Sequence, residues 1–459
     1  MENITIEACA AEGKALTHWN GVVVFVPFAV PGDVVDIRVT KKSKNYYEGF
    51  IERIVTPSKD RLEPFCQHFG VCGGCKWQPL PYPMQLEAKR QQVYDQLVRI
   101  GHLNVPGIRP TIPSDNIRYY RNKLEFTFSS KRWLLKDEDI DNVPENDRMG
   151  LGFHVGKFFD KVLDIKHCYL QKDPSNDIRL FIKKYAVENG LDFFDIRQNV
   201  GYVRNMFIRT TDTGDLMVIM CFFYENREDR EKMLDAIAEA FPQITSLYYI
   251  INNKLNDSIG DQECILYKGE PTIRETMESL TFRIGPKSFY QTNSEQACKL
   301  YSVARDFAEL TGNEIVYDLY TGTGTIAQFV SGKAAKVVGI EYVPEAIEDA
   351  KVNAAGNGIT NCEFFAGDMK DVLSRDFIEE HGQPDVIIMD PPRAGIHPDV
   401  AKVILEASPA RMVYVSCNPA SQARDLALFA DKYEITAVQP VDMFPHTQHV
   451  ENVCALRLR

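Results

Sequence analysis

Short apolar strands alternate with helical segments from residue 286 to the end of the sequence, and this alternation constrains the fold more than any other feature. The first strand, loop and helix start lie in EIVYDLYTGTGTIAQFV (314–330), and later strands lie in KVVGIE, CEFFAGD, DVIIMDPPR and MVYVSCNP. Strands that alternate with helices form parallel, doubly wound sheets. We therefore predict an α/β domain over 286–459. Its tail, 434–458, contains two strands without a helix between them, which predicts an antiparallel pair.

Polar residues stand where these strands end, and the carboxyl ends of the strands form the ligand-binding edge of a doubly wound sheet. From the first strand to the fifth they are Asp318 with Thr321-Gly322-Thr323-Gly324, Glu341, Asp368, Asp390 and Cys417. Glycine lets the backbone approach a ligand closely. Glu341 suits a bidentate hydrogen bond to the hydroxyls of a ribose. The sequence therefore predicts a cofactor that carries a nucleoside at this edge.

Two cofactor classes fit the glycine loop. A dinucleotide site requires G-x-G-x-x-G, and the loop G-T-G-T-I-A offers Ala327 at the third position, so the loop alone leaves NAD open. Asp318 favours S-adenosylmethionine, because the cationic amino acid end of that cofactor lies where a pyrophosphate would otherwise sit.

Cys417 can be interpreted in two ways. Free cysteine is among the most buried residue types, so a core cysteine at the end of a strand is one interpretation. The other is a nucleophile held at the reactive edge of the sheet. The position of Cys417 at the same edge as Glu341 and Asp390 favours the nucleophile. Asn418 and Pro419 then shape the turn that presents the sulfur.

Residues 1–60 have the pattern of a small β-rich unit. From Arg38 to Arg61 there are seven basic and three acidic residues, with Tyr46 and Tyr47 among them. This combination suits RNA binding by phosphate neutralisation and base stacking, and a solvated strand face is the alternative. The net charge of −12 argues against indiscriminate binding of polyanions and is compatible with a local basic face.

The stretch 61–285 mixes strand-like runs with a helix predicted over 226–241, and it carries candidate metal ligands. Three cysteines in the spacing C-x5-C-x2-C around a Gly-Gly pair, and a fourth farther along, are Cys66, Cys72, Cys75 and Cys168. Zinc and iron–sulfur centres both use cysteine, so the spacing leaves the two open. In YYRNKLEF, Arg121 and Lys123 are candidates to bind RNA phosphates, with a solvated strand edge as the alternative.

The sequence contains no run of 18 apolar residues that predicts a transmembrane helix. Its start, MENITIEACAAEGKAL, lacks the basic and apolar regions of a secretion signal. We therefore expect a cytoplasmic protein without membrane contact. In that reducing compartment the 11 cysteines are expected to be core residues, metal ligands or catalytic thiols rather than disulfides.

Five motifs carry a resemblance to a known family. They are FYQTN (289–293), the glycine loop TGTG (321–324), MDPPRAGIH (389–397), VSCNP (415–419) and TQHVENV (447–453). In order and spacing they resemble those of the bacterial RNA 5-methyluridine (uracil-5-) methyltransferases. The N-terminal unit resembles the TRAM domain of that family, and CQHFGVCGGC resembles its cluster-binding segment. The chain is most similar to the 23S rRNA branch, whose members combine the barrel and the cluster.

The resemblance implies an architecture and an activity. Residues 1–60 are expected to form a TRAM-like, OB-like β-barrel that binds RNA, 61–285 a central α+β domain with a [4Fe–4S] cluster, and 286–459 a Rossmann-like S-adenosylmethionine-dependent methyltransferase domain. The implied reaction transfers a methyl group from S-adenosylmethionine to carbon 5 of a specific uridine in RNA through a covalent cysteine–uracil adduct. The implied substrate is 23S rRNA, and the family suggests a monomer.

The resemblance also assigns residues. It implies that Cys417 is the nucleophile and Glu451 the base. It places Gln291, Tyr320, Glu341 and Asp390 in the cofactor pocket, and it makes Cys66, Cys72, Cys75 and Cys168 the ligands of the cluster. One departure is visible: the family loop usually reads Asp-Leu-Phe-Cys-Gly, whereas this chain has DLYTG (318–322). Backbone contacts to a cofactor survive this change.

Several rival functions remain to be weighed. The tRNA T-loop enzyme belongs to the same class, but it typically lacks the barrel and the cluster. A non-catalytic iron–sulfur RNA-binding factor would have a decayed active site, yet Cys417 and Glu451 are both present. A cysteine-dependent reductase that uses NAD is disfavoured by the residues of the cofactor pocket. Amino-nitrogen methylases place an aromatic residue after Asp-Pro-Pro, where this chain has Arg393.

Overall fold

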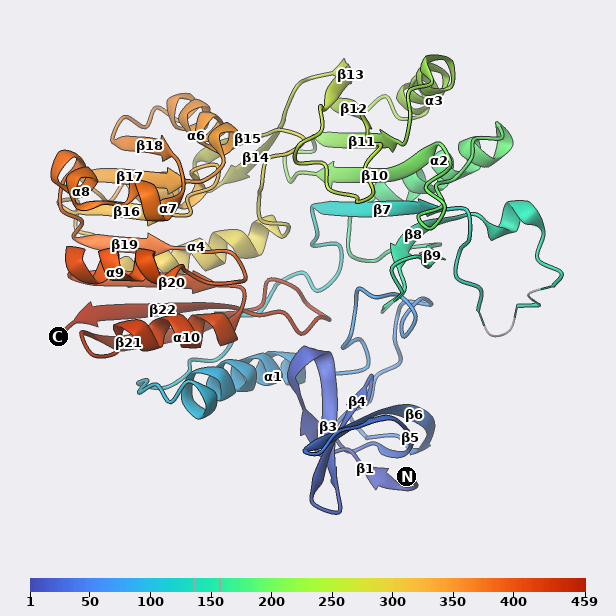
Figure 1. The fold of residues 1–459 in the computed structure, drawn as a ribbon, viewed down its shortest axis with the longest axis horizontal. Helices are drawn as coiled ribbons and strands as arrows, with labels where there is room; N and C mark the ends of the chain where they lie inside the picture. The colour runs from blue at the N-terminus through green and yellow to red at the C-terminus, as the bar shows by residue number, and fades with distance from the viewer. Residues whose placement is uncertain (136–137, 140, 157) are drawn as a thin grey trace.

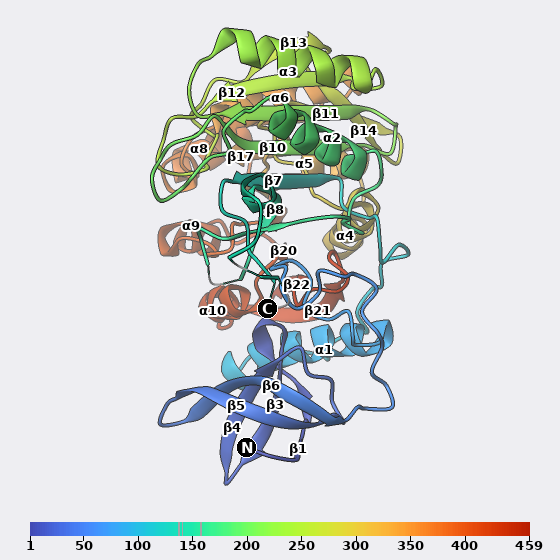
Figure 2. The ribbon, with the colours of Figure 1, turned by 90° about the vertical axis from the view of Figure 1, so that its right-hand side faces the viewer.

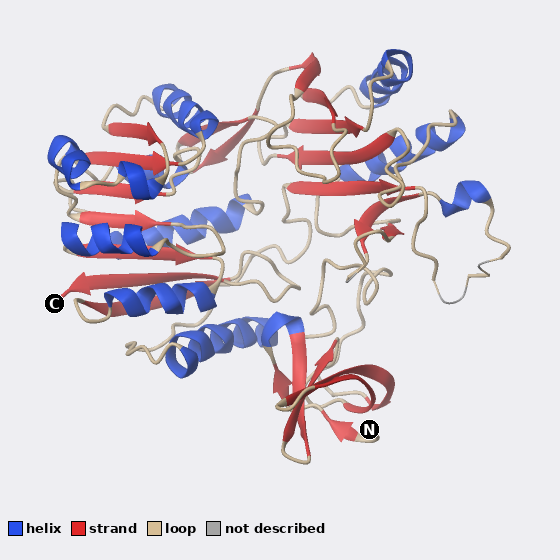
Figure 3. Ribbon diagram, in the orientation of Figure 1, coloured by secondary structure: helices blue, strands red, loops and turns tan. Residues whose placement is uncertain are grey.

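The computed structural model describes residues 1–135, 138–139, 141–156 and 158–459. Its described strands form three larger sheets and one two-stranded hairpin (Figures 1 and 3). In Figure 1 the N-terminal sheet lies at the bottom, the central sheet at the right and the C-terminal sheet at the left. Among these residues no helix is both long enough and apolar enough to cross a membrane.

The N-terminal sheet has six strands in the order β1-β5-β6-β4-β3-β2. They are β1 (Ile4–Thr5), β2 (Ala8–Cys9), β3 (Lys14–Trp19), β4 (Val22–Pro27), β5 (Val34–Lys42) and β6 (Tyr46–Thr56), with a 3-10 turn η1 (Ala11–Gly13) before β3. Alternate residues of β4 and β5 are buried in one small core: Val24, Val26, Val35 and Ile37. Successive side chains of a strand point to opposite faces, so one face forms this core and the other meets solvent.

The central sheet has seven strands in the order β13-β12-β11-β10-β7-β8-β9. Its elements are β7 (Lys123–Ser129), η3 (Glu145–Arg148), β8 (Gly150–His154), β9 (Val162–Asp164), α2 (Ser175–Glu188), β10 (Val203–Thr210), β11 (Leu216–Phe222), α3 (Arg227–Ala240), β12 (Ser246–Ile251) and β13 (Ile265–Gly269). Along β11, Val218 and Met220 pack with α2 and α3, whereas Met217 and Ile219 pack into a core shared with the C-terminal sheet. The central sheet therefore lies between two layers.

The C-terminal sheet has seven strands in the order β18-β17-β16-β19-β20-β22-β21. They are β16 (Ile315–Leu319), β17 (Lys336–Glu341), β18 (Cys362–Ala366), β19 (Val386–Met389), β20 (Arg411–Ser416), β21 (Tyr433–Val441) and β22 (Glu451–Leu458). The first five in this order pair in parallel, and β22 runs antiparallel to both β20 and β21. The predicted parallel sheet and the antiparallel final pair are confirmed.

Helices cover both faces of this sheet. One face carries α4 (Ser294–Ala308), α5 (Thr325–Ser331), α6 (Pro344–Gly356) and the hairpin of β14 (Ile273–Met277) and β15 (Leu280–Ile284); the other carries α7 (Met369–Val372), α8 (Arg375–His381), α9 (Pro398–Ala407) and α10 (Pro419–Phe429). Val316 and Val413 belong to the first core, and their neighbours Tyr317 and Tyr414 to the second. Adjacent residues of one strand thus face opposite layers, as a doubly wound sheet requires.

Helix α1 (Tyr82–Tyr94), continued by a π-helical stretch η2 (Asp95–Ile100), lies between the N-terminal barrel and the edge of the C-terminal sheet (Figure 2). Lys89 on this helix is fully buried and pairs with the fully buried Asp442, just after β21. The Lys89 ammonium also donates to the carbonyl of Phe444 at 3.1 Å, and the Tyr82 hydroxyl donates to Asp442 at 2.9 Å. Both charges therefore have hydrogen-bond partners, which a buried ion pair needs.

We expect Lys89→Met to lower the free energy of unfolding by about 3–5 kcal/mol, because Asp442 would keep a buried charge without its partner. Urea denaturation at neutral pH measures the change. Lys351→Met is the matched control, since Lys351 pairs with Glu348 on an exposed surface, and its effect should not exceed about 1 kcal/mol. Equally small effects at the two positions would contradict the role of the buried pair.

Candidate active site

The glycine loop between β16 and α5 is shaped by Asp318. This residue is fully buried, and its Oδ2 accepts the N–H of Ala327 at 2.9 Å and the hydroxyl of Thr321. Burial raises the pKa of Asp318 to about 7. Its second oxygen, Oδ1, is buried and has no hydrogen-bond partner among the described residues. The loop therefore contains an unused acceptor where a cationic group would be favoured.

The two glycines of the loop have different surroundings. Gly324 has φ +74°, and a Cβ there would lie 2.9 Å from side-chain atoms of both Ala350 and Phe364, so packing requires glycine. Gly322 has φ +55°, and a Cβ there would meet nothing within 4 Å. The first glycine thus lets α5 pack on the sheet, and the second borders open space.

Glu341 ends β17 and faces the same loop. One of its carboxylate oxygens accepts the N–H of Gly322, and the other accepts the N–H of Val343, both at 3.1 Å. Each oxygen keeps a further lone pair for an external donor. Glu341 therefore ties the loop to the second strand and remains able to bind two hydroxyls.

Gln291 and Asp390 lie around a residue that the sequence did not indicate, Tyr301 of α4. Tyr301 is buried, and the side chain of Gln291 lies near enough to lower the pKa of its hydroxyl, against the larger effect of burial. Its pKa is raised well above the usual value by burial and then by the charge of Asp390. Asp390 follows β19, and burial followed by the charge of Asp318 raises its own pKa to about 7. Tyr301 has the spacing of a core residue on an amphipathic helix, which hides its polar contact.

Tyr320 directly follows β16. It has φ +65°, an uncommon conformation for a residue with a side chain. Burial raises its pKa to about 12, and the backbone of His397 lowers it in part. Tyr320 therefore lies at the turn out of β16, with its hydroxyl against the loop that follows β19.

Cys417 is presented by the turn between β20 and α10. Asn418 caps the helix through a bond from the N–H of Ala420 to its Oδ1 at 3.2 Å, and Pro419 occupies the first helical position. The Asn418 amide also donates to the carbonyl of Arg393 at 3.0 Å. The expected turn-forming role of Asn418 and Pro419 is confirmed, and it leaves Cys417 partly exposed.

Glu451 reaches Cys417 through the antiparallel pairing of β22 with β20. In that pairing Ser416 lies opposite Asn452, so Cys417 and Glu451 are the next positions along. Burial raises the pKa of the Cys417 thiol to about 11, and the charge of Glu451 contributes next. Burial and then Asp390 raise the pKa of Glu451 to about 8. The structure therefore brings together a thiol and two carboxyl groups.

Arg393 adds a positive charge beside Cys417 and Glu451. Its charge lowers the pKa of both Cys417 and Glu451, against the larger effect of burial. Its Nη2 lies 3.4 Å from Nδ1 of His449, whose pKa is lowered to about 4 by burial and then by Arg393. His449 is therefore neutral at physiological pH.

The four cysteines predicted as cluster ligands gather beside β8 and β9. Burial raises the pKa of the Cys75 thiol to about 12, and the other three thiols, Cys66, Cys72 and Cys168, each add to the shift. The backbone of Cys168 is held by Asn176, whose Oδ1 accepts its N–H at 2.8 Å. In the described part of the chain, no three His, Cys, Asp or Glu side chains are arranged to hold a single metal ion.

The two histidines beside these cysteines have other partners. His68 Nε2 accepts the N–H of Lys166 at 2.8 Å, and His167 Nε2 lies 3.2 Å from the Tyr119 hydroxyl. The Nε2 atom of each of these two histidines is therefore engaged within the chain.

The candidate RNA-binding residues differ in exposure. On the β5–β6 hairpin the ammonium of Lys41 lies over the ring of Tyr46 and that of Lys42 over Tyr47. Lys123 instead lies over the ring of Phe207, and burial lowers its pKa to about 8. The hairpin therefore presents basic groups to solvent, whereas Lys123 is a poorer phosphate ligand than the sequence suggested.

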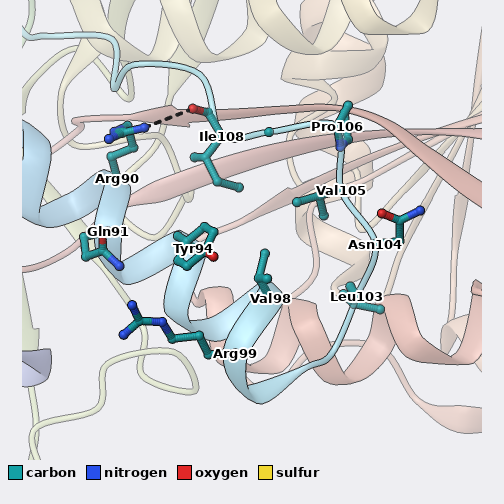
Figure 4. A pocket seen from close by; sticks show the side chains of 11 residues that line it. Arg90, Gln91, Tyr94, Val98, Arg99, Leu103, Asn104, Val105, Pro106 and Ile108 are labelled. Atoms are coloured by element: carbon teal, nitrogen blue, oxygen red, sulfur yellow. Dashed lines mark hydrogen bonds between the residues drawn. The ribbon is translucent and has the colours of Figure 1, made fainter.

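A groove of about 610 Å³ lies away from these groups (Figure 4). It is bordered by the end of α1, the π-helical stretch and the loop 103–108. Its two arginines, Arg90 and Arg99, pair with Glu87 and Asp95. Cys417 does not line this groove, so the groove is separate from the candidate active site.

A parallel sheet with a glycine loop and acidic strand ends, preceded by a small β-barrel, defines an S-adenosylmethionine-dependent methyltransferase with an N-terminal TRAM domain. The profile of the tRNA (uracil-5-)-methyltransferase family matches residues 207–459, and that of the TRAM domain matches residues 2–51. The chain belongs to the tRNA (uracil-5-)-methyltransferase family, and the resemblance found in its motifs is confirmed.

Full-length relatives agree with this assignment. Proteins named uncharacterized RNA methyltransferases from Porphyromonas gingivalis and Bacteroides thetaiotaomicron are 59% and 57% identical to this chain. The alignments cover 97% and 98% of this chain and 98% and 100% of those proteins. The crystal structure of the Pyrococcus abyssi tRNA (uracil-54, C5)-methyltransferase with S-adenosyl-L-homocysteine is similar with a TM-score of 0.76 and 29% identity, over 99% of this chain and 100% of that one.

We expect Glu451→Gln to be more stable than the wild type at pH 9 and to lose this advantage as the pH falls to 5. The pKa of Glu451 is raised in the folded state to about 8, so its contribution to stability is complete below the unfolded pKa of about 4.5 and is lost as the pH rises through 8. Glutamine carries no charge to desolvate at any pH.

Urea denaturation of the two proteins between pH 5 and pH 9 measures the difference. Asp371→Asn, an exposed carboxyl to amide change on α7, is the control and should show a difference that varies little with pH. A constant difference for Glu451→Gln would contradict the raised pKa.

Proposed function

We propose that this chain methylates carbon 5 of a uridine in RNA through a covalent adduct between Cys417 and the uracil, with 23S rRNA as its substrate. The observation that carries the proposal is the register of β22 against β20, which sets Glu451 opposite Cys417 at the ligand-binding edge of the sheet. A nucleophile and a base in one pocket are what this chemistry needs.

The residues act in sequence. Carbon 5 of uracil is a weak nucleophile until the Cys417 thiolate adds to carbon 6, which turns the ring into an enolate. S-adenosylmethionine, when bound, supplies an electrophilic methyl group. After transfer, Glu451 removes the proton from carbon 5, and the electrons of that C–H bond restore the ring double bond as Cys417 leaves. A pKa of about 8 for Glu451 suits a general base near neutral pH.

The residues at the strand ends fit the cofactor. The unpartnered Oδ1 of Asp318 is an acceptor for the cationic amine, and the carboxylate of Glu341 has lone pairs left for the ribose hydroxyls. We propose Gln291, Tyr320 and Asp390 as the other contacts. Open space beside Gly322 supports this placement.

The substrate has two candidates. The motifs resemble those of the 23S rRNA branch, which favours ribosomal RNA. The Pyrococcus enzyme, which its name assigns to uracil 54 of tRNA, aligns over 99% of this chain and so includes the barrel region. The barrel therefore does not separate the two substrates, in contrast to the expectation that the tRNA enzyme lacks it. Uridine 54 of tRNA is accordingly the second candidate.

We also propose that Cys66, Cys72, Cys75 and Cys168 hold a [4Fe–4S] cluster. A cluster binds each thiolate through a different iron, so its ligands stand farther apart than those of one ion. The four thiols lie close enough together to raise one another's pKa. The reducing compartment that the sequence predicts favours metal ligands over disulfides, and both points support this proposal. Its role would be structural, because methyl transfer moves no net electrons.

We expect the wild type to form a covalent adduct with RNA that carries 5-fluorouridine, in the presence of labelled S-adenosylmethionine. Fluorine cannot leave carbon 5 as a cation, so the methylated intermediate stays attached to Cys417 and is seen on a denaturing gel. Fragments of 23S rRNA and whole tRNA are compared as substrates, and the RNA that is trapped identifies the target.

Cys417→Ala should form no adduct, whereas Cys454→Ala, which removes a thiol from the core of β22, should still form it. An adduct that persists in Cys417→Ala would refute the proposed nucleophile. Absence of an adduct from the wild type with either RNA would favour the non-catalytic binding factor.

We expect protein prepared without oxygen to contain about four irons and four sulfides per chain, as a [4Fe–4S] cluster requires. Cys72→Ser should lose most of the iron, because one of the four ligands is missing. Cys298→Ser, a partly buried thiol on α4, is the matched control and should retain it. Iron and acid-labile sulfide assays give the outcome, and zinc in place of iron would overturn the cluster.

A further inference from the structure

The loop 442–450, here called the base loop, joins β21 to β22 and leads directly into Glu451. Groups from three other parts of the chain hold it. Gln296 of α4 donates to the carbonyl of Asp442 at 2.8 Å, and Lys89 of α1 pairs with the carboxylate of the same residue. Tyr120, before the central sheet, donates to the carbonyl of Pro445 at 3.0 Å. The base loop that leads into Glu451 is thus held by distant segments of the chain.

His446 is the most constrained residue of the base loop. It is 4% exposed and has φ +64°, in the left-handed region that residues with a side chain rarely adopt. Such a conformation persists only where the surroundings over-determine it.

Residues beside the predicted cluster cysteines converge on His446. Phe65, next to Cys66, packs edge-on against the imidazole with ring centroids 5.0 Å apart. Tyr169, next to Cys168, packs edge-on against Phe65 at 5.3 Å. Two of the four cysteines are thus one residue away from an aromatic stack that ends on the base loop.

The backbone that follows Cys75 reaches the same residue. The N–H groups of Lys76 and Trp77 both donate to the carbonyl of His446, at 2.8 and 3.0 Å. A carbonyl oxygen has two lone pairs and can accept both bonds. The cysteine segment and the base loop are therefore joined directly through the main chain.

Gln85 of α1 reinforces this junction from a fully buried position. Its Nε2 donates to the carbonyls of Trp77 and Leu80 at 3.0 and 2.8 Å and lies 3.2 Å from His446 Nδ1. Its Oε1 accepts the N–H of His446 at 2.8 Å. One amide thus binds the cysteine segment on one side and the base loop on the other.

We infer that the cysteine segment positions the catalytic base through His446 and Gln85, so that disturbing this junction displaces Glu451 more than it displaces Cys417. Cys417 is held separately, because the next residue, Asn418, caps α10 and donates to the carbonyl of Arg393. Loss of the cluster then impairs the last step of the reaction, proton removal, before the first. The inference rests on the proposed function and assigns His446 and Gln85 as positioning residues.

Gln85→Leu tests the inference, because leucine removes the amide and puts an apolar side chain of similar size in its place. With ordinary RNA and labelled S-adenosylmethionine, we expect this variant to accumulate a methylated protein–RNA adduct and to release product about 10- to 100-fold more slowly than the wild type. The adduct accumulates because Cys417 acts before methyl transfer and Glu451 after it. Glu451→Gln provides the reference for the same stalled adduct.

Gln328→Leu is the matched control. Gln328 is as buried as Gln85, and its amide contacts Asn357 and Ala350 within the C-terminal domain. It is expected to lower stability without accumulating adduct. Release by Gln85→Leu at the wild-type rate, without adduct, overturns the inference. Absence of a wild-type adduct on 5-fluorouridine RNA overturns the proposed function instead.

Hydrogen exchange of the unmodified protein gives a second measurement that does not depend on activity or on a folded variant. We compare anaerobically prepared protein with protein whose iron has been removed by oxidation and chelation. Backbone amides of 442–450 are expected to exchange about tenfold faster after iron removal, while those of β16 and β17 do not change. Unchanged exchange in 442–450 overturns the link between the cysteine segment and the base loop.

Discussion

The antiparallel pairing of β22 with β20 is the constraint on which the candidate active site depends. Five parallel strands bring a glycine loop, Glu341, Asp390 and Cys417 to one edge of the sheet. A sixth parallel strand would begin at the opposite edge. Because β22 runs the other way, its first residue, Glu451, lies at the same edge and beside Cys417. The fold thereby places a carboxyl group at this edge that a further parallel strand could not place there.

Because β22 is antiparallel to β21, the chain must turn between them at the ligand-binding edge of the sheet. That turn, the base loop, has buried polar groups, and each needs a partner. The partners come from α1, from α4 and from the segment that carries the cysteines, and they include the fully buried pair of Lys89 with Asp442. The same contacts that satisfy the turn therefore attach the N-terminal half of the chain to the catalytic edge.

The strand-end residues could be predicted because their signal is local. Each follows an apolar run, and the carboxyl ends of parallel strands must share one edge. The order of five motifs along the chain then indicated the family. Tyr301, His446 and Gln85 gave no such signal. Gln85 and His446 are separated by 361 residues, and Tyr301 has the spacing of an ordinary core residue, so their contacts depend on packing between segments that no local pattern connects.

The sequence by itself determined the class of fold, the glycine loop and the family, since these follow from local patterns and from the order of short motifs along the chain. Only the tertiary structure decided how the thiol is surrounded. It placed Glu451 and Asp390 near Cys417 and buried the carboxyls enough to raise the pKa of Glu451 to about 8. It also placed His446 against the cysteine segment. Burial and electrostatic coupling depend on which distant atoms exclude water from a group, and that is a property of the packed chain.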